Sequence, residues 1–274
     1  MTGPSPALDP LNHAVRRDLA DRALAGRVIA PHYASPVRRS CGAHAAFVRR
    51  SPSDEAEAVT ELLPGEAFEV LEYAAGWAWG YCGADRLVGY VEAIALACPT
   101  LGTHIVCEKC APVAADDSII SPVLAHLPMG SRLCGKEIGA CLATEYGCVS
   151  LAHLRRFDEH DEDPVVVAER LIGTPYLPGG RSFGGIDSPG LIQLALSLCG
   201  HESPRLPEEQ RRLGIPLPQG APLRRGDLIL FDGDGGLMVD DLLMIHACPM
   251  AGKVTVDPVA IIDRPGMERR RLAL

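Results

Sequence analysis

The stretch from Gly179 to Gly200, GGRSFGGIDSPGLIQLALSLCG, constrains the fold of this chain more than any other. A glycine-rich approach leads into Asp187 and Ser188, and apolar residues then recur with the 3.6-residue period of a helix. Pro189 suits the first helical turn, where its missing N–H has no effect, and Gly200 suits the position after a helix end. The sequence therefore predicts that Ser188 lies at or just before a helix N-terminus.

Two roles are open for a side chain at such a helix start. Backbone N–H groups and the helix dipole favour negative charge there, so a nucleophile is often held in this position. Asp187 or Ser188 could equally be the N-cap of the helix and nothing more. Local sequence alone favours the capping role.

Composition and charge exclude several classes of protein. The 274 residues, 47% of them hydrophobic, suit one to three globular domains with a sizeable core. The net charge is −9, and the short run Arg269–Arg271 is interpreted as a solvated end, so no nucleic-acid partner is expected. The N-terminus lacks the pattern of a secretory signal, and no apolar run approaches 18 residues. We therefore expect a cytoplasmic protein with no membrane-spanning segment.

The ten cysteines are expected to be reduced thiols, because no secretory signal is seen. Cys107 and Cys110 form a CxxC pair, but HIVCEKCAPV is interpreted as one strand, on which residues three apart face opposite sides. A zinc site, which needs four ligands, is therefore disfavoured. Cys248 is interpreted as a thiol in a strand-end loop. No P-loop, GxGxxG or HExxH motif is present, and no metal or cofactor is expected.

Four parts follow one another along the chain. Residues 1–36 form an arm, with a short helical pattern over Arg16–Gly26, that is expected to pack across other domains. Residues 37–99 contain five short strands and resemble a bacterial SH3-like domain, and residues 100–158 repeat the scheme more weakly. The segments that carry the first resemblance are the Ser51-Pro52 loop, LLPGEAFEV, GWAWGY and the final GYV.

Trp77, Trp79 and Tyr81 fall on one face of a predicted strand by its two-residue period. Such a stripe is more often core than a stacking wall for a ligand, and both roles stay open here.

Residues 159–274 form the last domain. Asp163 and Pro164 suit the N-cap and first position of a helix that Gly173 ends. After the organising helix come a proline-broken loop, a buried strand, a hairpin over Gly236–Ala247 and two further strands. Two helices followed by an antiparallel meander predict an α+β domain.

Segments of this domain resemble, in order, the motifs of the NlpC family of papain-like cysteine peptidases. The segment GTPYLPGGRSFGGIDSPGLIQLAL matches the family's G-x-P-Y-x-W-G-G and D-C-S-G-L-V-Q. SPRLPEEQ matches its P-R-D-S-x-x-Q, and RRGDLILF matches its G-D-L-V-F-F. LMV and MIHA match the hairpin that carries the family's base and its third polar residue. Two SH3-like domains ahead of such a domain are also a family arrangement. The resemblance implies a papain-like domain and, for the family, cleavage of peptides from bacterial cell-wall murein.

The resemblance fails at the residues that carry the chemistry. Ser188 stands where the family has its nucleophilic Cys. Asp234, counted twelve residues back from His246, stands where the family has its His base, and His246 keeps the type of the third residue. Pro178 replaces a Trp of the family. Asp187, which in relatives helps to hold the free amino end of the substrate, is retained.

These exchanges remove the usual means of activation. A thiol with a pKa near 8.5 and an imidazole near 6.5 exchange a proton close to neutral pH, whereas a serine hydroxyl needs a stronger base than a carboxylate whose pKa is near 4. A serine triad also requires His between Ser and Asp, but the resemblance implies that residue 234 contacts the nucleophile.

The sequence therefore predicts a non-catalytic relative of the murein peptidases that binds a murein-derived peptide or a protein partner. An active hydrolase using Ser188 with Asp234 or His246 is one alternative. An interaction scaffold that binds through its SH3-like domains is another. The predicted ligand contacts are Asp187, Pro178, Trp79, Tyr81 and Arg205.

Overall fold

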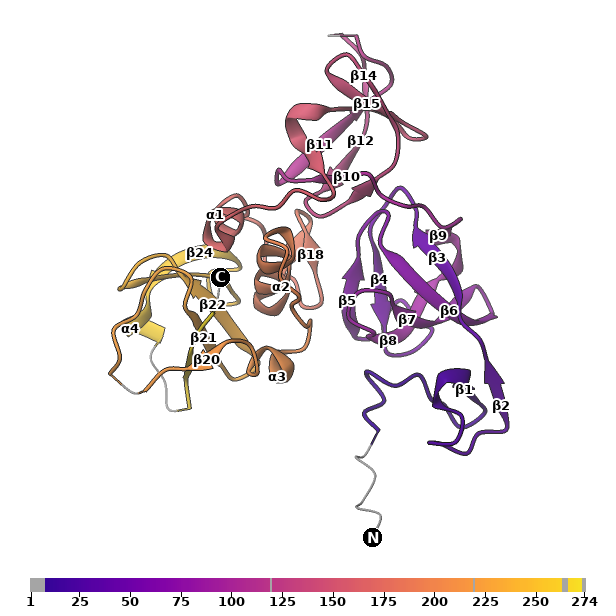
Figure 1. The fold of residues 1–274 in the computed structure, drawn as a ribbon, viewed down its shortest axis with the longest axis horizontal. Coiled ribbons are helices and arrows are strands. Elements are labelled where there is room, and N and C mark those ends of the chain that lie inside the picture. The colour runs from indigo at the N-terminus through magenta and orange to yellow at the C-terminus, as the bar shows by residue number, and fades with distance from the viewer. Residues whose placement is uncertain (1–7, 119, 219, 263–265, 273–274) are drawn as a thin grey trace. The chain divides into compact units, whose positions relative to one another are not determined.

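The computed structural model of the chain describes residues 8–118, 120–218, 220–262 and 266–272 (Figure 1). It divides into two compact units, Met1–Thr100 and Leu101–Leu274. Over the described ranges, no helix has the length and apolar character needed to cross a membrane.

The first unit is built on a seven-stranded antiparallel sheet with the order β5-β4-β8-β7-β6-β3-β9. The elements are β3 (Val37–Cys41), β4 (Ala46–Arg49), β5 (Ala58–Leu62), β6 (Ala67–Ala74), β7 (Trp77–Cys82), β8 (Val88–Glu92), the 3₁₀ turn η2 (Ala93–Ala95) and β9 (Leu96–Ala97). Ala75 and Gly76 turn the chain between β6 and β7, and both have positive φ values, 49° and 83°. The five predicted short strands are present as β4 to β8, and β3 and β9 add two that were not predicted.

The segment Arg16–Gly26 forms no α-helix, so the helix predicted there is wrong. The chain instead forms β1 (Leu19–Asp21), the 3₁₀ turn η1 (Arg22–Leu24) and β2 (His32–Ala34), and β1 pairs with β2 in parallel. Leu19 packs with Trp79 and Tyr81 in one buried cluster. The apolar spacing therefore serves packing on the sheet, which overrides a weak helical preference.

The second unit begins with two small antiparallel sheets of orders β13-β10-β17 and β12-β11-β16-β15-β14. The elements are β10 (His104–Val106), β11 (Cys110–Ala114), β12 (Val123–Pro128), β13 (Arg132–Leu133), β14 (Lys136–Ile138), β15 (Cys141–Thr144), β16 (Gly147–Ser150), the 3₁₀ turn η3 (Leu151–His153) and β17 (Leu154–Arg156). The two sheets share one buried apolar cluster that includes Val106, Leu127 and Leu142.

Cys107 and Cys110 do not lie on one strand, contrary to the prediction. β10 ends at Val106 and β11 begins at Cys110, so CEKC connects the two strands. The Cys107 Sγ donates a hydrogen bond to the His153 carbonyl oxygen at 3.3 Å. The pattern was misread because the apolar residues on both sides of CEKC belong to two different strands.

The rest of the second unit contains a six-stranded antiparallel sheet with the order β20-β25-β21-β22-β23-β24, a separate two-stranded sheet β18-β19, and short helices. The helices are α1 (Pro164–Glu169), α2 (Ser188–Leu198), α3 (Pro207–Gln210) and α4 (Val259–Ile262). The strands are β18 (Arg181–Ser182), β19 (Gly185–Ile186), β20 (Ile215–Pro216), β21 (Leu228–Phe231), β22 (Asp234–Met238), β23 (Leu243–Cys248), β24 (Lys253–Pro258) and β25 (Glu268–Arg271). Helix α2 contacts β22 and β23 (Figure 1).

This architecture confirms the predicted fold class, an α+β domain preceded by small all-β domains. The segment SPRLPEEQ, predicted as a loop, does contain the one-turn helix α3, which starts at Pro207.

Capping residues set the starts of the two predicted helices. The Asp163 side chain accepts a hydrogen bond from the Val165 N–H at 2.8 Å at the start of α1. Asp187 does the same for the Gly190 N–H, also at 2.8 Å, at the start of α2. These contacts confirm the predicted N-termini. Helix α1 ends at Glu169, earlier than predicted, and the chain makes a further turn before Gly173 with φ of 79°.

Candidate functional site

Ser188 is the first residue of helix α2, and it is fully buried, with 0% of its surface exposed. Its hydroxyl donates a hydrogen bond to the Ala247 carbonyl oxygen at 3.0 Å. Ala247 lies on β23 between His246 and Cys248. The start of the helix is therefore tied directly to the strand that carries the third predicted site residue.

Asp187 is held by groups of the chain itself. Its Oδ2 accepts hydrogen bonds from the Gly179 N–H and from Nη2 of Arg205, both at 2.7 Å, while Oδ1 accepts the capping bond from Gly190. Asp187 is 9% exposed and Arg205 is 3% exposed. Both side chains fix the loop at the helix start, and the prediction that they contact a ligand stays a prediction.

Asp234 opens strand β22 and lies against Ser188. Its carboxyl group is in hydrogen-bond contact with the Ser188 side chain and accepts the Gly235 N–H at 3.0 Å. Burial raises the pKa of Asp234 above its ordinary value, although the Ser188 contact, the Gly235 N–H and the charge of His246 oppose the rise. Desolvation is the largest effect, so the uncharged acid is favoured more than in water.

His246 lies on β23 opposite Gly236 of β22. Its Nε2 is 3.1 Å from Oδ2 of Asp257, and its buried Nδ1 has no hydrogen-bond partner within the described part of the chain. A Cβ atom on Gly236 would lie 2.4 Å from the Ile245 carbonyl oxygen and 2.9 Å from the His246 Cβ. Only glycine therefore allows the two strands to hold this imidazole in place.

The groups stand in the order Ser188, Asp234, His246, Asp257. A carboxyl group contacts the serine, and the imidazole is turned to a second carboxylate. A serine triad needs the imidazole in contact with the hydroxyl, so this arrangement lacks the contact that would remove the hydroxyl proton.

Two parts of the chain match models of known protein families. Residues 173–267 match the NlpC/P60 family, and residues 48–96 match the bacterial dipeptidyl-peptidase SH3 domain. The C-terminal domain is therefore similar to the NlpC/P60 family. The chain is 27% identical over 238 residues to dipeptidyl-peptidase 6 of Lysinibacillus sphaericus, which covers 75% of this chain and 86% of that protein.

Two further comparisons bear on parts of the chain and on its fold. A Mycobacterium tuberculosis protein named probable endopeptidase is 31% identical over 98 residues, which are 35% of this chain and 25% of the relative. The crystal structure of an NlpC/P60 family protein from Bacillus cereus matches with a TM-score of 0.72 and 16% identity, covering 87% of this chain and all of that one. This last likeness shows a shared fold.

Tyr176 is a residue near Asp234 and Asp187 that the sequence analysis did not single out. Burial raises the pKa of its hydroxyl, and the negative charges of Asp234 and Asp187 raise the pKa further. The Tyr176 hydroxyl is therefore near enough to both carboxyl groups for their charges to act on it. The signal was available, because Tyr176 is the Tyr of the GTPY segment that matches the family motif.

Asp257 and Cys248 were also missed as neighbours of His246. Asp257 comes from β24, eleven residues after His246, and no local motif joins the two. Their proximity depends on the pairing register of β23 with β24.

The remaining predicted contacts are placed as follows. Pro178 is exposed and precedes Gly179, whose N–H binds Asp187. Trp79 and Tyr81 are 3% and 6% exposed in the first unit. The guanidinium of Arg16 lies 4.3 Å from the Trp79 ring centre, and that of Arg86 lies 4.4 Å from the ring centre of Tyr81. The two rings are core residues, so the stacking wall that the sequence left open is not formed by their faces.

Proposed function

We propose that the NlpC/P60 domain is a non-catalytic relative of cell-wall peptidases and that the chain binds a murein-derived peptide. One observation carries the proposal. Ser188, at the position of the family nucleophile, is fully buried and its hydroxyl is bonded to the Ala247 carbonyl oxygen. A nucleophile has to touch its substrate, and a buried hydroxyl donating to a backbone carbonyl does not.

The electrostatics of the site support the same conclusion. A thiol is activated by an imidazole because their pKa values lie close to each other and to neutral pH. The group beside Ser188 is the carboxyl of Asp234, and even with a raised pKa it remains a far weaker base than an alkoxide. Proton transfer from Ser188 to Asp234 is therefore strongly uphill.

A hollow in the second unit offers a place for a small peptide. It has a volume of about 500 Å³ and is lined by Glu108, Lys109, Cys110, Ala152, His153 and Phe183. One anionic group, one cationic group and an aromatic ring suit a short peptide that carries both a free amino group and carboxylates. The Lys109 Nζ is held 3.1 Å from the Ile172 carbonyl oxygen, which fixes the cation at the edge of the NlpC/P60 domain.

Calorimetric titration of the full chain with a murein-derived tripeptide tests binding, and chromatography of the same mixture tests cleavage. Binding without cleavage products is expected, and the Ser188→Ala variant should bind with unchanged affinity. Lys109→Gln should weaken binding about tenfold, because it removes one charge-assisted contact. Lys136→Gln, an exposed lysine on β14 outside the hollow, is the matched control. Absence of binding at millimolar tripeptide would contradict the proposal.

One observation favours a residual hydrolase instead. Asp234 contacts the Ser188 side chain and has a raised pKa, which is the direction a general base requires. A fluorophosphonate probe distinguishes the two functions. Covalent labelling of the wild-type chain that disappears in Ser188→Ala would replace the binding proposal with a serine hydrolase, and no labelling is the result expected here.

A further inference from the structure

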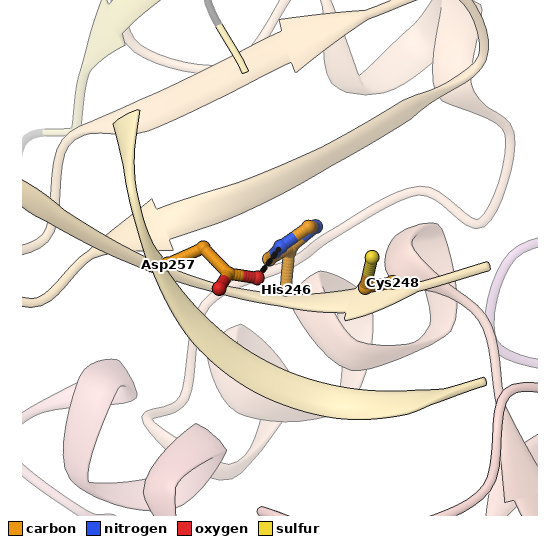
Figure 2. Close-up of side chains that lie close together, drawn as sticks. All are labelled: His246, Cys248 and Asp257. Atoms are coloured by element: carbon orange, nitrogen blue, oxygen red, sulfur yellow. Dashed lines mark hydrogen bonds and ion pairs between the residues drawn. The ribbon is translucent and has the colours of Figure 1, made fainter. Parts of the chain in front are cut away.

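His246, Cys248 and Asp257 form a cluster of potential metal ligands on one face of the β23–β24 pair. In the antiparallel register His246 is opposite Thr255 and Cys248 is opposite Lys253, so the even-numbered positions of β23 and the odd-numbered positions of β24 share a face. One ligand atom from each of the three residues lies within 4.8 Å of the other two. Figure 2 shows the imidazole joined to the Asp257 carboxylate, with the sulfur farther along the same strand.

We propose that these three residues bind a divalent cation of the zinc class. An imidazole nitrogen, a thiolate sulfur and a carboxylate oxygen are all zinc ligands, and sites with three protein ligands keep a fourth position for water. A thiolate in the set disfavours magnesium and calcium, which take oxygen ligands. Within the ranges that the structure describes, this is the one group of three or more His, Cys, Asp or Glu donors close enough to share an ion.

The geometry requires one small adjustment. Donors around a tetrahedral zinc ion lie about 3.5 Å apart, given metal–ligand distances of about 2.0–2.3 Å. The Nε2 of His246 and Oδ2 of Asp257 are already 3.1 Å apart. The sulfur of Cys248 lies within 4.8 Å of the other two donors and has to approach by at most about 1 Å, which rotation of a side chain at the end of a strand supplies.

The surroundings of each donor suit the bound state. His246 is 4% exposed, so its ring is held by packing before any metal arrives. The Ala251 N–H points at the Cys248 sulfur at 3.4 Å and would stabilise its thiolate. Lys253, opposite Cys248, is exposed and its charge can turn to solvent. The thiol proton passes to the buffer on binding, and the thiolate and carboxylate together balance the charge of the cation.

Such an ion would cross-link β23 to β24 next to the turn at residues 249–252. It would also occupy a nitrogen of His246, which stands third among the family's site positions. The proposal does not depend on peptide binding in the hollow, because the two sites share no residue.

Titration of the untagged full chain with Co²⁺, followed by competition with Zn²⁺, tests the site directly. One equivalent of Co²⁺ is expected to produce a thiolate-to-cobalt charge-transfer band, and Zn²⁺ should displace it. Cys248→Ser should abolish the band, and Asp257→Asn should weaken Zn²⁺ binding by at least about tenfold. Cys134→Ser, which removes an exposed thiol elsewhere in the second unit, should change neither result.

Three outcomes would overturn the proposal. They are the absence of a charge-transfer band in the wild-type chain, a band that survives Cys248→Ser, and a band lost only in Cys107→Ser or Cys110→Ser. Far-ultraviolet circular dichroism of each variant shows that it is folded, and Cys248→Ala replaces Cys248→Ser if the latter is not. Tripeptide binding measured in Cys248→Ser separates failure of this site from failure of the peptide proposal.

Discussion

Replacing Asp187 with alanine is expected to destabilise the second unit by about 4–6 kcal/mol. The change removes the N-cap of α2, which is worth about 1 kcal/mol. It also breaks the ion pair with Arg205, whose loss costs about 3–5 kcal/mol when a charge is left buried. The side chains of Arg205 and Asp187 are 4% and 12% exposed, so solvent screens this pair little.

Two partner variants separate the contributions. Asp187→Asn keeps an oxygen for the Gly190 N–H and loses the charge, so it should cost about 3–5 kcal/mol. In a double-mutant cycle, Asp187→Ala and Arg205→Ala should show a coupling energy of about 2–3 kcal/mol, at the upper end for residues in one network.

Urea unfolding with two optical probes measures these values unit by unit. Both tryptophans of the chain, Trp77 and Trp79, lie in the first unit, so their fluorescence reports that unit. The described α-helices all lie in the second unit, so far-ultraviolet circular dichroism reports it. The dichroism midpoint should fall while the fluorescence midpoint stays unchanged.

Asp158→Asn is the matched control, because it removes an exposed carboxylate 4.0 Å from Arg156 in the same unit. It should leave both midpoints unchanged. A loss below about 1 kcal/mol in Asp187→Ala, or a coupling energy near zero, would refute the reasoning that the buried pair holds the helix start.

Three further predictions concern single groups. Asp234→Asn should stabilise the second unit at pH 7 and have little effect at pH 3. The raised pKa of Asp234 contributes stability that is fully present below the unfolded-state pKa near 4 and is lost as pH rises through the folded-state pKa. The loss is about 1.4 kcal/mol for each pH unit between the two pKa values, and urea midpoints measured across pH check it. Burial raises the pKa of Cys41 to about 12, so iodoacetamide at neutral pH should label exposed Cys98 and spare Cys41 until the chain is denatured, as mass spectrometry can show. Asp163→Ala should cost about 1 kcal/mol by loss of the α1 cap, and Asp163→Asn, which keeps the cap but not the ion pair with Arg225, should cost less in the same urea assay.

Local features of the chain were predictable because their physics is local. Asp163 and Asp187 are capping residues within three positions of the N–H groups they bind. The hairpin that brings Asp234 toward His246 follows from a count of residues across a short turn, and the structure pairs its two strands with Gly236 opposite His246. The family motifs add the order of elements, and the fold class follows from them.

Features that depend on neighbours far along the chain were not predictable. The arm has apolar residues at helical spacing, yet Leu19 lies on a strand and packs with Trp79 and Tyr81. The same contact decides that the two aromatic side chains are core. CEKC was taken for part of a strand because local hydrophobicity does not show where one strand ends and the next begins.

The candidate site also has local features that the sequence predicts and long-range features that it does not. The sequence by itself determined that Ser188 stands at a helix start, because the capping residue and the helical period are local features. The resemblance to the NlpC family predicts that Ser188 and Asp234 stand in place of a Cys and a His. Only the tertiary structure decided that Ser188 is fully buried, and that His246, Cys248 and Asp257 meet on one face of two strands. Burial and cross-strand register arise from the packing of whole elements, and no short segment of sequence contains that information.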